Sequence, residues 1–159
     1  MRVSLTWPEQ IFAAQAGAMR RISAMSGERP EPHGTPRCDL WGNDIESCGA
    51  EMAVAKVLGL YWQSVVRNTE DVNGDVSGVE VRSTTHPQGR LILHDADKDD
   101  APYVLVRGQF PSYELIGWIK GRDGKREEYW FNGDGRAAYF VPDSELRSFP
   151  ITECSEVTT

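Results

Sequence analysis

The first apolar pattern along the chain predicts a helix close to the N-terminus. Thr6 can cap it, Pro8 is tolerated in its first turn, and Glu9 can return a capping-box hydrogen bond, so we expect a helix over residues 7–26. Apolar residues then recur three and four positions apart, which is the period of one helix face. The stripe that this period predicts to be buried contains Ile11, Phe12, Gln15, Met19 and Ile22.

A second helix is expected to begin at Asp44 or Ser47 and to end at Leu58, where Gly59 is the stop signal. Its predicted inward stripe is formed by Ile45, Met52, Ala55 and Leu58. Several small residues on this segment permit close packing against a sheet.

Beyond residue 60 the pattern becomes that of strands. Residues 103–107 are almost continuously apolar, as is typical of a central strand covered on both faces. The other expected strands are 61–66, 79–83, 90–94, 113–120 and 137–141, followed by a short helical turn at 142–146. Two helices followed by several strands predict an α+β fold.

Length and composition place the chain among single-domain globular proteins. Of its 159 residues 40% are hydrophobic, so we expect one domain over residues 1–150 with its core at about 44–141. The proline-rich stretch 28–36 is expected to be a connecting loop, and residues 151–159 a flexible tail. No apolar run approaches membrane-spanning length and no signal-peptide pattern precedes the first helix, so a cytoplasmic location and no membrane partner are expected.

The most informative chemistry lies in residues 73–82. Asp75 precedes Glu80 across a glycine-marked turn, and the alternation of Val79 to Arg82 places Glu80 and Arg82 on one strand face. If Asp75 and Glu80 flank a four-residue hairpin loop, two carboxylates face each other and a divalent cation would relieve their repulsion. Ordinary turn chemistry followed by a solvated strand face is the alternative interpretation.

Together with Glu51 on the second helix, this segment resembles the PD-(D/E)XK nuclease superfamily, which includes restriction endonucleases and phage exonucleases. The resemblance implies a restriction-endonuclease-like core, a mixed β-sheet flanked by helices, here with an extra N-terminal helix. It also implies Mg²⁺-dependent cleavage of phosphodiester bonds, with Mn²⁺ as a substitute metal and DNA as the substrate. By the same resemblance Glu51, Asp75 and Glu80 bind the metal, and Arg82 occupies the position of the family's lysine.

Arginine at this position retains the charge but is a poor base, so Arg82 would stabilise the phosphate while the metal activates water. Lys56 and Lys98 are the lysines available as substitutes. The residues expected to bind substrate near this site are Thr84, His86, Arg90 and Lys98. A polar connection between two strands is the alternative interpretation of residues 83–90.

The net charge of −7 opposes binding to a polyanion, although bound metal would neutralise part of it. A second hypothesis is therefore a catalytically inactive module of the same fold that binds DNA or a protein partner, as an inhibitor or a nucleic-acid mimic. Small nucleases of this type, often encoded by phages, frequently act as homodimers, so self-association is a further implication of the resemblance.

Overall fold

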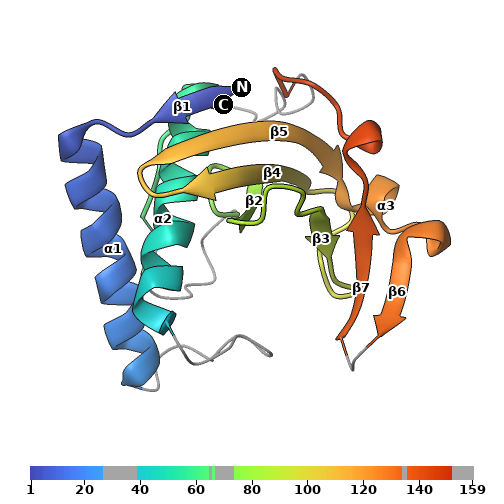
Figure 1. Ribbon diagram of the computed structural model, residues 1–159, viewed down its shortest axis with the longest axis horizontal. Helices are drawn as coiled ribbons and strands as arrows, with labels where there is room; N and C mark the ends of the chain where they lie inside the picture. The colour runs from blue at the N-terminus through green and yellow to red at the C-terminus, as the bar shows by residue number, and fades with distance from the viewer. Residues whose placement is uncertain (27–38, 65, 67–73, 134–135, 152–159) are drawn as a thin grey trace, which may run out of the picture.

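The computed structural model describes residues 1–26, 39–64, 66, 74–133 and 136–151. The N-terminal part is a hairpin of two helices, and the remainder forms two sheets, which confirms the α+β class (Figure 1). The helices are α1 (Trp7–Met25), α2 (Leu40–Leu58) and the single-turn α3 (Gly121–Gly124). The strands are β1 (Arg2–Ser4), β2 (Glu80–Thr84), β3 (Leu91–Leu93), β4 (Pro102–Gln109), β5 (Ser112–Lys120), β6 (Trp130–Gly133) and β7 (Arg136–Val141).

The larger sheet is mixed and has the order β1-β5-β4-β2. β2 runs parallel to β4, with Glu80 opposite Tyr103 and Thr84 opposite Arg107, whereas β5 is antiparallel to both of its neighbours. The smaller sheet is antiparallel, in the order β3-β7-β6. Short 3-10 turns at Glu127–Tyr129 and Asp143–Glu145 precede β6 and follow β7.

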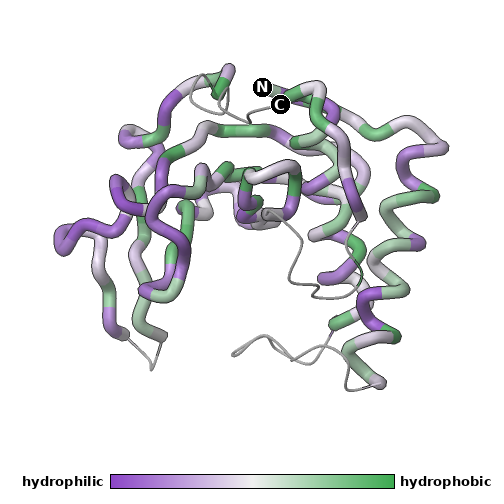
Figure 2. Tube along the Cα trace, turned by 180° about the vertical axis from the view of Figure 1, so that it is seen from behind, coloured by the Kyte–Doolittle hydropathy of each residue, from purple (hydrophilic) through white to green (hydrophobic). Residues whose placement is uncertain are grey.

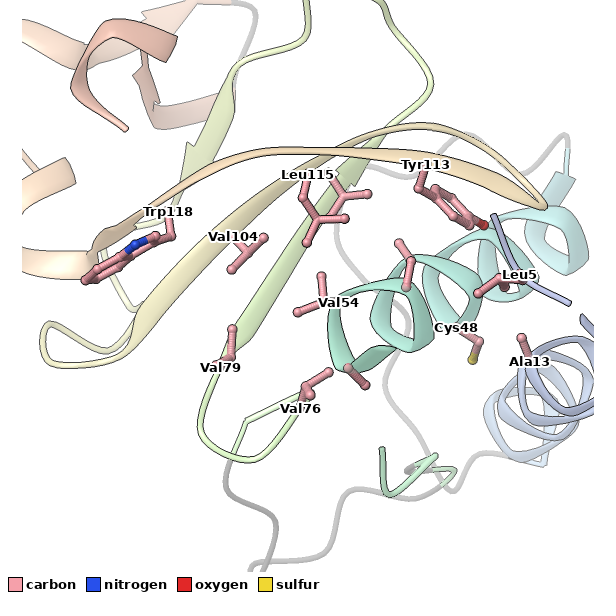
Figure 3. Packing of buried hydrophobic residues seen from close by; sticks show 14 of the residues in the cluster. Leu5, Ala13, Cys48, Val54, Val76, Val79, Val104, Tyr113, Leu115 and Trp118 are labelled. Carbon is pink, nitrogen blue, oxygen red and sulfur yellow. The ribbon is translucent and has the colours of Figure 1, made fainter. Parts of the chain in front are cut away.

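The central strand β4 separates two hydrophobic cores. Val104 and Val106 are buried with residues of α1 and α2, whereas Tyr103 and Leu105 are buried with residues of β3 and β7. Figure 3 shows the helix-side core, in which Val54 of α2 and Val104 of β4 come together. The alternation of neighbouring β4 residues between the two cores confirms the expectation of a strand covered on both faces.

Local signals account for the helix ends. The Thr6 N–H donates to Glu9 Oε2 at 2.6 Å, as the capping box predicts. α2 begins at Leu40, earlier than predicted, because the Asp39 side chain accepts a hydrogen bond from the Gly42 N–H and serves as N-cap. Gly59 ends α2 with a left-handed φ of 65°, which glycine adopts without strain.

The predicted orientation of α1 is wrong. Its inward face consists of small residues and two arginines, and a Cβ on Gly17 would lie 2.6 Å from the Ile45 Cα of α2. Such a close approach of two backbones is possible only along a face of small side chains. The apolar stripe consequently points outward, and Phe12 remains 62% exposed. The other members of the stripe, all exposed, are Ile11, Gln15, Met19 and Ile22.

Most predicted strands form within a few residues of their expected limits. The exception is 61–66, where residues 61–64 and 66 lie outside any strand and residue 65 is outside the described residues. The predicted loop at 28–36 and nearly all of the predicted tail at 151–159 are likewise outside the described residues. Within the described part of the chain, no helix is long and apolar enough to cross a membrane.

The two ends of the molecule differ in architecture. α1 forms one outer edge, and the β6–β7 hairpin lies at the opposite edge, as the hydropathy-coloured view from behind shows (Figure 2). β2, which contains the predicted site residues Glu80 and Arg82, lies between these two edges.

Candidate functional site

A tight turn places Asp75 beside the start of β2. Val76 and Val79 form an antiparallel bridge, and both side chains are fully buried in the core that contains Val54 of α2 (Figure 3). The bridge is an isolated one, and the Asp75 N–H also donates to the Val79 carbonyl at 3.0 Å, so Asp75 lies directly before the turn and Glu80 directly after it. The face-to-face placement of the two carboxylates remains a prediction. Both residues of the turn have positive φ angles, Ser77 (46°) and Gly78 (90°), and so does Gly74 (71°) just before it, which explains the glycines of the segment.

The carboxylate of Asp75 is held by backbone. Its Oδ2 accepts a hydrogen bond of 2.8 Å from the Val81 N–H, one residue beyond Glu80. Val81 packs toward the helix-side core, so the strand alternation turns Glu80 and Arg82 to the other face of the sheet. Asp75 therefore lies at the junction of the turn at 76–79, strand β2 and helix α2.

Glu51 sits one helical turn before Val54, so the packing of the turn against α2 brings it close to Asp75. Glu51 is only 4% exposed, and Arg20 of α1 binds it through two hydrogen bonds, Nη1 to Oε1 at 2.6 Å and Nη2 to Oε2 at 2.7 Å. The Trp62 Nε1–H donates to the same Oε2 at 3.0 Å. Both oxygens of Glu51 are thus engaged within the protein.

Electrostatics couple Asp75 to both glutamates. Burial raises the pKa of Glu51, an effect opposed by Arg20 and reinforced by the charge of Asp75. Burial also raises the pKa of Glu80, and Asp75 adds to this shift while Arg82 and Lys98 oppose it. The charge of Asp75 thus acts on both of the other predicted acids.

Arg82 and Lys98 surround Glu80 on the open side of β2. The Arg82 Nη2 contacts Asp97 Oδ1 at 3.0 Å, and its guanidinium lies 5.1 Å from the centre of the Tyr103 ring. Lys98 Nζ lies 3.7 Å from Glu80 Oε1 and is 65% exposed in its side chain. Burial, together with the charges of Asp97 and Glu80, raises the pKa of Tyr103 to about 12, so this phenol stays protonated.

The four residues predicted to bind substrate do not gather at one place. Lys98 lies with Glu80, whereas Thr84 is at the far end of β2, four residues or about 13 Å away along the strand. His86 Nδ1 accepts from the Gln88 N–H, and Arg90 is exposed just before β3. Contacts of this kind within residues 84–90 are those of a polar connection between strands.

Lys56, the other lysine considered as a substitute, belongs to a different surface. Its Nζ lies 2.8 Å from Glu9 Oε2 and donates to the Ser4 carbonyl, so it ties α2 to the start of α1. Lys98 is therefore the lysine whose position suits a role beside Glu80.

The donor set fits a cation only in part. Among the described residues, no group of three or more His, Cys, Asp or Glu side chains is arranged to hold a metal ion. Glu51 is unsuited to direct coordination because Arg20 and Trp62 already occupy both of its oxygens. Asp75 and Glu80 remain as oxygen donors, and the charge of Asp75 helps to raise the pKa of Glu80, which is the kind of repulsion that a divalent cation relieves.

Arg20, the partner of Glu51, was not among the residues that the sequence singled out. The residue continues an i, i+3, i+4, i+7 series with Ala13, Ala16 and Gly17, the face that packs on α2. A charged side chain in a series of small residues is a signal that could have been recognised, because a buried arginine requires an acidic partner. Trp62 and Asp97 were missed as well, since their partners are distant in sequence.

No protein-family model, no curated protein and no solved structure matches this chain.

Proposed function

We propose that the chain is a Mg²⁺-dependent nuclease that cleaves phosphodiester bonds, with DNA as its substrate, on a restriction-endonuclease-like core. The single observation that carries the proposal is the placement of Glu80 beside Arg82 and Lys98, with the Asp75 carboxylate bound by the backbone at the start of the same strand. The mixed sheet, with Glu80-Val81-Arg82 on β2 and α2 packed on the opposite face, supports the fold assignment.

Asp75 and Glu80 would hold the cation, which supplies Lewis-acid stabilisation of phosphate charge and a more acidic water. Glu51 would act as a positioning residue, because its charge is already used to fix Arg20 and Trp62 near Asp75. Arg82 and Lys98 would neutralise phosphate oxygens. Arg82 cannot serve as a base, since a guanidinium stays protonated and this one is paired with Asp97.

A direct test measures metal binding apart from catalysis. Millimolar Mg²⁺ or Mn²⁺ should raise the melting temperature of the wild type, because a ligand of the folded state stabilises it. The increase should disappear in Asp75→Asn and in Glu80→Gln. Glu114→Gln is the matched control, because this glutamate lies on β5 and pairs with Arg2. Equal shifts in Glu80→Gln and the wild type would exclude the metal site.

The activity test uses plasmid, linear, single-stranded and branched DNA with Mg²⁺ or Mn²⁺, and EDTA as control. Cleavage that requires metal and is lost in Glu80→Ala supports the nuclease. The absence of cleavage by every form of the protein would contradict it.

Arg20 and Arg82 are both paired with acidic residues, which favours a second candidate function. This candidate is an inactive module of the same fold that binds DNA or a protein. Arg20 is neutralised by Glu51, and Arg82 by Asp97, so neither is held ready for a phosphate. In this case the wild type should not cleave DNA, and Arg82→Lys should restore metal-dependent activity.

A further inference from the structure

The outer face of α1 is the largest anomaly of the described surface. Large apolar side chains normally point into the core from a surface helix, and polar ones point outward. Here the order is reversed, with exposed fractions from 40% for Ile11 to 72% for Trp7. The six exposed large side chains on this helix, called the α1 stripe below, are Trp7, Ile11, Phe12, Met19, Ile22 and Met25.

The α1 stripe follows one side of the whole helix. At 100° per residue, its members fall within an arc of about 140°, and Trp7 and Met25 lie at the same angle at opposite ends. Nineteen residues of helix correspond to a length of roughly 28 Å. The stripe is therefore a continuous linear surface and not a set of scattered side chains.

This surface carries no charge of its own. α1 contains three charged residues, Glu9, Arg20 and Arg21. Both arginines are buried on the inner side, and Glu9 is paired with Lys56 and the Thr6 N–H. A nucleic acid or an anionic membrane would need exposed basic groups, which the helix does not offer. The chemistry of the face suits another uncharged apolar surface.

The area of the stripe is that of one side of a dimer. At about 150–250 Å² for a large side chain, the exposed fractions leave roughly 500–900 Å² of apolar surface on this helix. The largest patch of a typical monomer measures about 300–600 Å², and a standard interface buries about 800 Å² per partner. The stripe is large enough to account for a stable dimer by itself.

We propose that α1 is a self-association surface that packs antiparallel against α1 of a second copy of this chain. In a two-fold dimer the same surface of both copies forms the contact, so the α1 stripe of one copy packs along the α1 stripe of the other. In the antiparallel arrangement, Trp7 of one copy lies near Met25 of the other. Gln15 and the half-buried Ala18 lie at the middle of the stripe, where the short side chain of Ala18 leaves room for the partner helix. This dimer does not depend on the proposed nuclease activity.

The first test is the mass of the protein in solution. Sedimentation equilibrium at micromolar concentration should give twice 17.8 kDa for the wild type. Phe12→Glu combined with Ile22→Glu places charges in the stripe and should raise the dissociation constant by at least about 100-fold. Phe131→Glu is the matched control, because Phe131 is similarly exposed, at 57%, but lies on β6. This control should remain a dimer.

A cysteine scan determines the direction of packing, and it works even if the charged variant fails to fold. With Cys38 and Cys154 replaced by serine, Gln15→Cys should form a disulfide between copies on mild oxidation because it lies near the two-fold axis. Trp7→Cys should not, since the two copies of that residue would be roughly 25 Å apart in an antiparallel pair.

Three results would overturn the proposal. The wild type could sediment as a monomer, the folded Phe12→Glu/Ile22→Glu variant could remain as dimeric as the control, or Trp7→Cys could cross-link while Gln15→Cys does not. The first excludes the second copy as occupant, the second moves the interface elsewhere, and the third requires parallel packing.

Discussion

Glu51 and Glu80 both lie near Asp75, and both have a raised pKa, but the protein treats them differently. Glu51 is 4% exposed and receives a bidentate arginine and an indole N–H. Glu80 is half-buried and has two cations beside it, Arg82 and Lys98, of which the Lys98 ammonium lies 3.7 Å from its Oε1. Hydrogen bonds inside the protein compensate the charge of the Glu51 carboxylate, whereas the Glu80 carboxylate has only partly exposed ionic partners.

This difference suits Glu51 to a structural role and Glu80 to the cation-binding role that we propose for it. A buried carboxylate that is fully hydrogen-bonded holds α1 to α2, and a cation would have to displace Arg20 to reach it. A half-buried carboxylate beside a second one stores repulsion that a bound cation could release. The same residue type therefore holds the two helices together at one position, and at the other it is the carboxylate that we propose binds a cation.

The largest effect is expected from Glu51→Gln. The substitution leaves the buried Arg20 guanidinium without its counter-charge, so we expect a loss of about 3–5 kcal/mol in the free energy of unfolding. Urea denaturation measures this loss. The double variant Arg20→Met/Glu51→Met should recover much of it, because removing both charges avoids an unpaired one. A loss below about 1 kcal/mol for Glu51→Gln would mean that the pair is not structural.

Trp62→Phe should have an intermediate effect. It retains most of the ring but removes the Nε1–H donor to Glu51, and hydrogen bonds to charged groups are worth about 1.5–3 kcal/mol. The melting temperature of this variant should therefore lie between those of the wild type and Glu51→Gln. Tyr61→Phe is the control, since Tyr61 is its neighbour and is 77% exposed.

The smallest effect, and one of opposite sign, is expected from Glu80→Gln. Loss of the contact with the exposed Lys98 costs little, about 0–1 kcal/mol, while repulsion from Asp75 disappears. We expect a melting temperature at neutral pH equal to or slightly above that of the wild type. A clear loss of stability, similar to that of Glu51→Gln, would remove the distinction between the two carboxylates.

The pH dependence sharpens the same comparison. Because the pKa of Glu80 is higher in the folded protein than its usual 4.5, the folded state binds this proton more tightly. The contribution of Glu80 to stability is therefore complete below pH 4.5 and is lost as the pH rises through the folded-state pKa. Any advantage of Glu80→Gln over the wild type at neutral pH should accordingly shrink as the pH falls to 4.5, as melting curves at several pH values would show.

Local rules were sufficient for much of the secondary structure and for part of the site. The capping box at Thr6 and Glu9, and the stop at Gly59, act within one helical turn. The turn that lies between Asp75 and Glu80 is equally local, because it is closed by the bridge between Val76 and Val79. Signals of this range are independent of the rest of the fold, so the sequence can show them.

The orientation of α1 could not be read from its own pattern. Periodicity identified the apolar stripe correctly as one face, but the adjacent small face packs against α2 because it allows the backbones of Gly17 and Ile45 to meet. Which of two faces is buried depends on what the partner helix offers. The apolar face that remains on the outside is then free to contact another molecule, as in the dimer proposed above.

The sequence by itself determined the two helices, most of the strands, the α+β class and the turn between Asp75 and Glu80. Only the tertiary structure decided that Arg20 neutralises Glu51, that Lys98 reaches Glu80, and that Thr84 lies at the far end of β2. The reason is physical: caps, turns and alternation act over a few residues, whereas the partner of a buried charge is chosen by the packing of elements distant in the chain.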